Sequence, residues 1–224
     1  MRALATVATL LYLWAPTPTE ATPLCRWIGL CLYLSPGFHL TVVDAETGKP
    51  LSDVYIWAEW VQYGAHGIGG PLMVQEAVTG AQGQATFPRW GPTFGSRGGL
   101  LLGTDPAVIL FKPGYATLLI DNGVSPGASQ HAPIRGFAHS GQTFRLQPFR
   151  GSAAEWVEQL RRLIHPALSS YASEAHLDRF RPLYLKQLQR VEAELAKLPT
   201  DAAGVAAFRS SLELDRKFLT GGHP

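Results

Sequence analysis

The stretch Phe38-His-Leu-Thr-Val-Val-Asp-Ala-Glu-Thr-Gly-Lys-Pro-Leu51 joins an alternating apolar run to a tight-turn phrase. Every second residue of its first half is apolar, which is the period of a strand with one face on a core. Gly48 can adopt a positive φ angle, and Pro50 fixes φ and lacks an N–H. The stretch therefore predicts a strand that ends in a tight turn.

The same alternation continues to about residue 150 and predicts a small antiparallel β-sandwich. The further expected strands are 54–61, 72–78, 84–90, 107–111, 115–121 and 143–147. Residues 79–83 are expected to join two of these strands as a hairpin, and Pro113-Gly114 to join another pair. Segments 63–71 and 90–106 are rich in glycine and are expected to be loops. Long loops often carry function, so a binding surface is expected first in segment 90–106.

The predicted strand 54–61 differs from the others because both of its faces carry bulky side chains. Ile56 and Trp60 lie on one face, and Trp57 and Val61 lie on the other. A strand that is apolar on both faces is typical of the centre of a sheet. The alternative is an aromatic surface on one side of the sheet.

Several short motifs occur in a characteristic order between residues 37 and 149. They are Val42-Val-Asp44, Thr47-Gly48, Pro50-Leu51, Asp53-Val54, the Gly83–Phe87 segment and Gly114-Tyr115. In these motifs the chain resembles the carboxypeptidase regulatory-like family, although Thr79-Gly80-Ala81-Gln82 stands where that family commonly has an Asp. The resemblance implies a transthyretin-like sandwich of about seven strands. It also implies support, folding or recognition rather than catalysis.

The period changes to that of a helix after the last predicted strand. Ser152 and Glu155 have the spacing of a capping box, and a second helical stretch over 173–198 is expected to be kinked or restarted at Pro182. A third helix is expected to begin at Thr200. The chain is therefore predicted to be α+β, with a β-sandwich over 37–149 followed by an α-helical hairpin over 152–220.

Composition excludes a strong electrostatic role. The 224 residues carry 19 basic and 17 acidic side chains, a formal charge of +2, and only 16% of residues are charged. A balanced surface of this kind is a poor match for nucleic acid, so no nucleic-acid partner is expected.

The N-terminus resembles an export signal or a retained membrane anchor over residues 1–21. Arg2 precedes the apolar stretch Ala3–Trp14, and Thr19-Glu20-Ala21 offers a cleavage site. Residues 22–36 form a lead-in segment, in which the apolar block Leu24–Leu34 is interrupted by Arg26 and indicates a strand or an interfacial segment. We expect an exported, periplasmic or extracytoplasmic location, with a membrane association through the N-terminus as an option.

Cys25 and Cys31 are the two cysteines of the chain. In an oxidising compartment they could close a small loop as a disulfide, and two free thiols are the alternative. They are a weak metal site, because no second pair of Cys or His follows at ligand spacing. No metal site and no cofactor are therefore predicted.

Aromatic side chains are the main binding candidates. The rings of Trp57, Trp60, Tyr63, Trp90 and Phe94 could stack on sugar faces. The binding residues that we name are Trp57, Trp60, Trp90 and Arg97. The competing interpretation is that these rings fill the core of the sandwich. Exposed, coplanar rings would favour a carbohydrate-binding module, and buried rings would favour packing.

Catalytic patterns are weak. The G-x-S-x-G match at residues 123–127 places Pro126 after Ser125, and proline has no N–H to donate to an oxyanion. A metal-dependent hydrolase would need the fold to bring His66, His131 and His139 together with an acid such as Asp105. No catalytic residue is predicted.

These observations predict a non-enzymatic exported protein of the cell envelope that acts as a structural or protein-interaction module. Another envelope protein or a glycan is the expected partner. A carbohydrate-binding module and, less favoured, a metal-dependent hydrolase are the alternatives.

Overall fold

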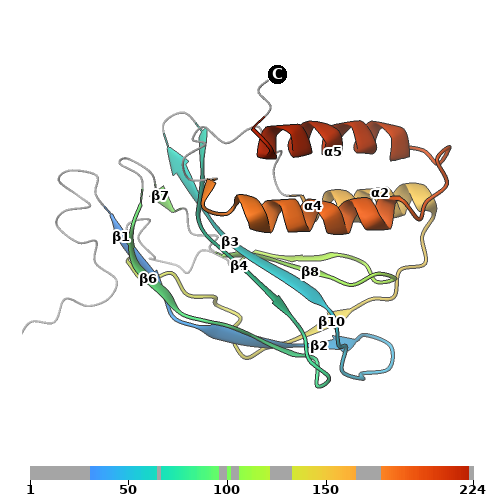
Figure 1. Cartoon of the computed structure of the whole chain (residues 1–224). Coiled ribbons are helices and arrows are strands. Elements are labelled where there is room, and N and C mark those ends of the chain that lie inside the picture. The colour runs from blue at the N-terminus through green and yellow to red at the C-terminus, as the bar shows by residue number, and fades with distance from the viewer. Residues whose placement is uncertain are drawn as a thin grey trace, which may run out of the picture.

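The computed structural model describes residues 31–64, 67–95, 100–101, 106–121, 133–164 and 178–221. Within them the fold is mixed α+β: strands come first along the chain, and helices follow (Figure 1). Most strand pairs are antiparallel. The predicted α+β class with C-terminal helices is confirmed at this level.

The larger sheet has the strand order β4-β3-β8-β9, and β7 pairs with the far part of β3. Its strands are β3 (Tyr55–Gly64), β4 (Gly67–Val78), β7 (Leu100–Leu101), β8 (Ala107–Phe111) and β9 (Leu118–Ile120). The prediction that the 54–61 strand is central is confirmed, because β3 lies between β4 and β8.

A three-stranded sheet has the order β10-β2-β5, and a two-stranded sheet pairs β1 with β6. The strands are β1 (Leu32–Ser35), β2 (Phe38–Asp44), β5 (Gln84–Phe87), β6 (Trp90–Phe94) and β10 (Thr143–Leu146). β2 pairs antiparallel with β5 and parallel with β10. The last strand therefore returns beside the first long one.

The larger and the three-stranded sheets share a core of aromatic side chains. Phe38 of β2 stacks on Phe87 of β5 with ring centroids 4.4 Å apart. Phe38 also meets Trp60 of β3 edge to face at 6.4 Å, and Trp60 contacts Trp90 of β6 at 5.2 Å. Because these rings come from all three sheets, their burial joins the sheets into one core.

Helices cover the opposite face of the larger sheet (Figure 1). They are α2 (Ala153–Arg161), α4 (Arg181–Leu195) and α5 (Val205–Leu219). Trp156 of α2 packs 6.1 Å from Phe111 of β8, and Tyr184 of α4 packs 5.1 Å from Trp57 of β3. The two faces of β3 are therefore covered, one by a second sheet and one by helices.

The helix boundaries follow local chemistry. Ser152 caps α2, and the Ser152–Glu155 capping box forms as predicted. Pro182 lies in the first turn of α4, where its missing N–H breaks no helical bond. α5 begins at Val205 rather than near Thr200, because the chain first makes a short turn that ends at Gly204. Residues 173–177 of the predicted second helix lie outside the described residues.

Three predictions about connections are wrong. The strands on either side of 79–83 do not form a hairpin, because β4 pairs with β3 and β5 pairs with β2 in another sheet. Most of the predicted loop 63–71 instead belongs to β3 and β4, which pair as far as Gly64 and Gly67. The predicted loop 90–106 contains β6 and β7. By contrast, β1 lies in the lead-in segment, where a strand was one of the two expected alternatives.

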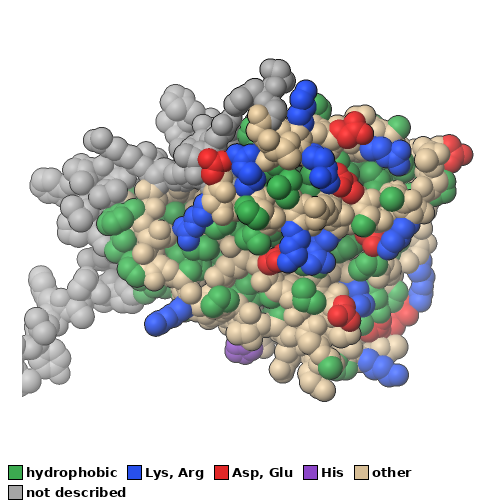
Figure 2. Space-filling view, in the orientation of Figure 1, with side chains coloured by type: hydrophobic (Ala, Val, Ile, Leu, Met, Phe, Trp, Pro, Cys, Tyr) green, Lys and Arg blue, Asp and Glu red, His purple; other side chains and the backbone are tan. Residues whose placement is uncertain are grey.

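The surface over the helices carries both signs of charge. Figure 2 shows Lys and Arg side chains interspersed with Asp and Glu over α4 and α5. One ion pair among the described residues joins two helices, where Arg216 of α5 bonds to Glu192 of α4. This face therefore has no single-sign field.

Candidate functional site

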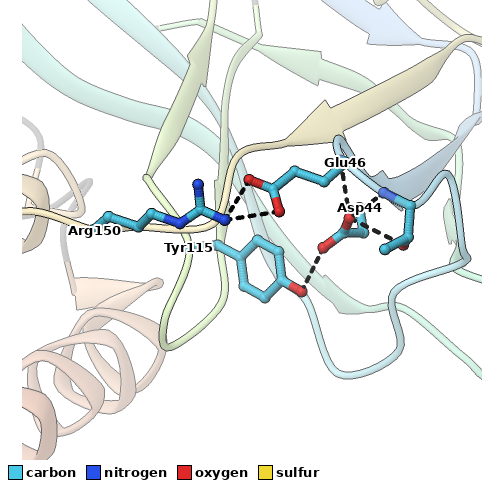
Figure 3. Close-up of polar contacts among 5 residues, drawn as sticks. Asp44, Glu46, Tyr115 and Arg150 are labelled. Carbon is cyan, nitrogen blue, oxygen red and sulfur yellow. Dashed lines mark hydrogen bonds and ion pairs between the residues drawn. The ribbon is translucent and has the colours of Figure 1, made fainter.

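The turn after β2 is organised by the carboxylate of Asp44 (Figure 3). Its Oδ1 accepts the N–H of Glu46 at 2.9 Å, the N–H of Thr47 at 2.7 Å and the Thr47 hydroxyl at 3.0 Å. Its Oδ2 accepts the hydroxyl of Tyr115 at 2.9 Å. We call Asp44, Glu46, Thr47 and Tyr115 the Asp44 cluster.

The Asp44 cluster joins distant parts of the chain. Tyr115 lies in the turn between β8 and β9, which belongs to the other sheet. Arg150, just before α2, also reaches this turn, with its Nη2 2.7 Å from Glu46 Oε1 (Figure 3). This ion pair is well exposed and adds little stability, whereas the Asp44 bonds fix the turn geometry.

Hydrogen bonding shifts the pKa values of two groups in this cluster. The backbone N–H of Thr47, followed by the hydroxyl of Tyr115, lowers the pKa of the Asp44 carboxyl below its usual value. The same bond to Asp44 raises the pKa of the Tyr115 hydroxyl. Asp44 is therefore a carboxylate acceptor and Tyr115 a neutral donor, an arrangement that holds a turn.

A second polar cluster lies between β3 and α4. Glu59 is 2% exposed, and its Oε2 accepts the indole N–H of Trp57 at 3.0 Å. Its Oε1 accepts the hydroxyl of Tyr184 at 2.5 Å, and Glu59 and Tyr184 make further contacts as well. We call Trp57, Glu59 and Tyr184 the Glu59 cluster. Each oxygen of this buried side chain therefore has a hydrogen-bond donor, as buried polar groups require.

Further polar contacts hold α4 on the same sheet face. Lys186 forms an ion pair with Glu76 of β4. The guanidinium of Arg190 lies 4.3 Å from the centre of the Tyr55 ring. Burial raises the pKa of the Tyr55 hydroxyl, so this phenol stays neutral. The helix is thus attached to the sheet by charged and aromatic groups as well as by apolar ones.

The three predicted tryptophans are packing residues. Trp57, Trp60 and Trp90 are 1%, 0% and 7% exposed, so their faces are not offered to a sugar at the surface. The physical reason is that both faces of β3 are covered. Trp57 lies under α4, and Trp60 packs against Trp90 between the sheets. The alternative of core packing therefore describes them. Arg97 lies outside the described residues.

The residues of the alternative, a metal-dependent hydrolase, lie largely outside the described residues. His66, His131 and Asp105 are among those not described, as is Ser125. His139 is half-buried and packs edge to face on Phe137 at 5.5 Å. Among the described residues, no group of three His, Cys, Asp or Glu side chains could hold a metal ion.

Cys31 is buried and disulfide-bonded. Cys25 lies outside the described residues, so the predicted pairing of the two stays a prediction.

An open groove lies between the C-terminal half of α4 and α5. Its volume is about 250 Å³, and it is lined by Glu192, Leu195, Ala196, Arg209, Leu212 and Glu213. Sequence reasoning did not single out this groove, because its lining comes from two helices whose relative placement no local pattern fixes. No helix among those described is long and apolar enough to span a bilayer.

Sequence reasoning also missed Glu59 and Tyr184. The signal for Glu59 was present: it is the charged residue on a strand whose two faces are otherwise apolar. A charge at such a position needs a buried partner. Nothing in the sequence marks Tyr184 as that partner, since it follows in a helix far along the chain.

Comparisons with known proteins do not show a family for this chain. No family model matches the chain, and no curated protein matches it. Among solved structures, it is similar to the 3-chlorocatechol 1,2-dioxygenase from Rhodococcus opacus 1CP, with 17% sequence identity and a TM-score of 0.30. The match covers 52% of this chain and 61% of that one, so this chain spans less than two thirds of the dioxygenase. A likeness this weak carries no argument about activity.

Proposed function

We propose that this chain is an exported, non-enzymatic protein of the cell envelope. Its β-rich part would be a transthyretin-like, carboxypeptidase regulatory-like sandwich that serves as a structural or protein-interaction module. The observation that carries this proposal is the Asp44 cluster. Residues from separate motifs of the family resemblance, Asp44, Thr47 and Tyr115, meet there although Asp44 and Tyr115 are 71 positions apart.

The chemistry of the polar clusters supports a scaffold. In the Asp44 cluster the donors and acceptors fix one turn and tie it to another. In the Glu59 cluster they tie the sheet to α4. Both carboxylates are engaged by protein donors, and such satisfied networks rigidify and specify a structure.

Two observations support the envelope location. Residues 1–21 have the charge and apolar pattern of an export signal. Cys31 is disulfide-bonded, and disulfides persist mainly in oxidising compartments outside the cytoplasm.

Cell fractionation combined with N-terminal sequencing tests the location. The chain, tagged at its C-terminus, is expected in the envelope fraction, either beginning near residue 22 or retaining its leader in membranes. A cytoplasmic chain that still begins with Met1 would overturn the envelope role.

The interaction role is tested by purifying the tagged chain from mildly solubilised membranes after crosslinking in intact cells. A Tyr184→Phe variant that has lost the bond to Glu59 serves as the comparison, because it loosens α4 on the sheet. A specific partner that crosslinks to the wild type supports the proposal. A chain that crosslinks to no envelope protein or glycan contradicts it.

A further inference from the structure

The outward face of β1 is apolar, which is unusual for the solvent side of a small sheet. Tyr33 and Ser35 point into the core and are almost fully buried, so Leu32 and Leu34 point outward. A sheet with one face on a core normally alternates apolar inward and polar outward residues. On β1 the outward residues are two leucines instead.

Two neighbouring segments extend this apolar face. Phe94 of β6 lies directly opposite Leu32, and Ile134 forms a bridge with Leu34. The bridge is closed by the bonds from Leu34 N to Pro133 O and from Arg135 N to Leu34 O, each 2.8 Å. Residues directly opposite one another in a sheet project to the same face. Leu32, Leu34, Phe94 and Ile134 therefore form one surface, the β1–β6 patch.

The β1–β6 patch is exposed. Phe94 is 55% exposed and Ile134 is 42% exposed, and Leu32 and Leu34 are partly exposed. Of the five large apolar side chains that stand out as exposed among the described residues, these two lie together, whereas Val78, Leu119 and Leu214 lie on other elements. In Figure 2 hydrophobic side chains gather at the left-hand edge of the described part, over β1 and β6. Contiguous exposed apolar residues mark contact with a partner or a membrane.

The charge around the patch has one sign. Residues 31–37, 88–95 and 133–137, which make up β1, β6 and the segment around the Ile134 bridge, contain no Asp or Glu. They do contain Arg89, which is exposed, and Arg135, which is buried. The acidic side chains of the described residues lie elsewhere: Asp44 ends β2, Asp121 follows β9, and the others lie on the connection from β2 to β3, on β3 and β4, and on or beside the helices. An apolar patch in basic, acid-free surroundings complements an anionic lipid surface.

The apolar N-terminal part of the sequence continues directly into β1 of the β1–β6 patch. β1 begins at Leu32, inside the apolar block Leu24–Leu34 and after the apolar stretch Ala3–Trp14. If the N-terminal region is inserted in or lies on a bilayer, the first element of the folded domain that meets the lipid is β1 with its neighbours.

We infer that the β1–β6 patch is a membrane-contact surface that inserts Phe94 and Ile134 among the lipid headgroups, with Arg89 near anionic phosphates. This inference rests on the proposed envelope location, and it adds the surface and the partner chemistry. An exposed aromatic ring and a branched aliphatic side chain beside an exposed arginine are groups that favour the bilayer interface.

Flotation of the purified full chain with lipid vesicles tests the inference. The vesicles contain phosphatidylcholine with phosphatidylglycerol, or phosphatidylcholine alone. The Phe94→Ser, Ile134→Ser double variant is compared with a control double variant, Val78→Ser, Leu214→Ser, which removes equally exposed apolar side chains from β4 and α5. Circular dichroism establishes that each variant is folded.

The patch variant is expected to bind anionic vesicles at least about tenfold more weakly than the wild type, because two buried apolar groups are lost. The control variant should stay within about twofold of the wild type. Arg89→Gln should weaken binding to anionic vesicles by roughly fivefold and leave binding to phosphatidylcholine alone unchanged.

Equal binding by the patch variant and the wild type would overturn the inference, as would an equal loss in the control variant. A wild type that binds no vesicles would overturn it too. These outcomes are independent of the fractionation experiment, because the purified chain reports on lipid contact and the cell fractions report on location.

Discussion

At the scale of single residues, a few buried polar side chains decide how the turns are built. Asp44 closes its own turn by accepting the N–H of Thr47, and Thr79 bonds to backbone groups of the distant segment 51–54. Thr79 is 3% exposed, its Oγ1 accepts the N–H of Val54 at 2.9 Å, and its hydroxyl donates to Leu51 O at 2.6 Å. A buried backbone group without a hydrogen-bond partner lowers the stability of the folded state. These side chains therefore contribute more to stability than their size suggests.

Replacing Thr79 with valine is expected to lower the free energy of unfolding by about 2–3 kcal/mol, because the N–H of Val54 and the carbonyl of Leu51 lose their partner. Urea unfolding measures the change. Thr79→Ser keeps the hydroxyl and should cost about 1 kcal/mol or less. If the valine variant is as stable as the serine variant, the hydroxyl does not hold this turn.

The Asp44 cluster predicts a sensitivity to acid. Because the folded pKa of Asp44 lies below its ordinary value of 3.8, its contribution to stability is present above that pH and is lost as the pH falls through the folded pKa. Asp44→Asn should therefore be less stable than the wild type at neutral pH, and the difference should shrink in acid. Tyr115→Phe removes one of the donors and should give an intermediate acid dependence. Urea unfolding across a pH series measures this, and parallel curves for all three proteins would contradict it.

At the scale of elements, β3 is the organising strand. Its neighbours β4 and β8 pair with it on both edges, and side chains from a second sheet and from α4 cover its two faces. The bulk on both faces of this strand made its central place predictable from sequence. The packing of α2 and α4 on the outer face of the sheet was less predictable. These helices follow far along the chain, and their amphipathic patterns do not show which surface they cover.

Tyr184→Phe tests how α4 is held. The variant keeps the ring against Trp57 and removes the donor to the buried Glu59 carboxylate, so it should cost about 1.5–3 kcal/mol of unfolding free energy. Thermal and urea unfolding measure the loss. The matched control is Phe218→Leu, a change in a partly buried side chain of α5. A Tyr184→Phe variant as stable as the wild type would contradict the assigned role of the Glu59 cluster.

The hairpin that was wrongly predicted shows where sequence reasoning stops. Residues 79–83 have the glycines of a turn, and Gly83 does adopt a positive φ angle. A Cβ at Gly83 would lie 2.3 Å from the carbonyl oxygen of Val42, so this glycine is needed for the close approach of β2. The same turn residues suit a hairpin and a crossing between sheets, and only the pairing partner of Gln84 distinguishes them. The strand signals were readable, but the sheet to which each strand belongs was not.

The candidate sites were likewise predictable from the sequence only where local residues determine them. The Asp44 turn was readable, because Asp44, Gly48 and Pro50 are turn residues in sequence order. Its bond to Tyr115 was not, because that contact depends on the fold. The tryptophans were ambiguous for a related reason: a large ring on an alternating strand fits a core and a binding surface equally well until the other side of the sheet is known.

At the scale of the whole molecule, the two ends differ in chemistry. The helices carry interspersed charges of both signs (Figure 2), and the described residues of β1, β6 and the Ile134 bridge include no Asp or Glu. The membrane contact that we propose would lie at this second end and leave the helices facing water. The sheet β4-β3-β8-β9 lies between the two and is the rigid part on which both depend.

Hydrogen–deuterium exchange on the full chain tests most directly whether β3 is buried between a second sheet and a helical layer. Peptides from β3 (Tyr55–Gly64) should exchange most slowly of all, opening only with global unfolding, while the exposed turn 45–49 exchanges rapidly. Peptides from α4 should be nearly as protected as β3, and Tyr184→Phe should accelerate exchange in α4 more than in β3. Exchange in β3 as fast as in the turn would mean that one of its faces is open to water, and the scaffold described above would be contradicted.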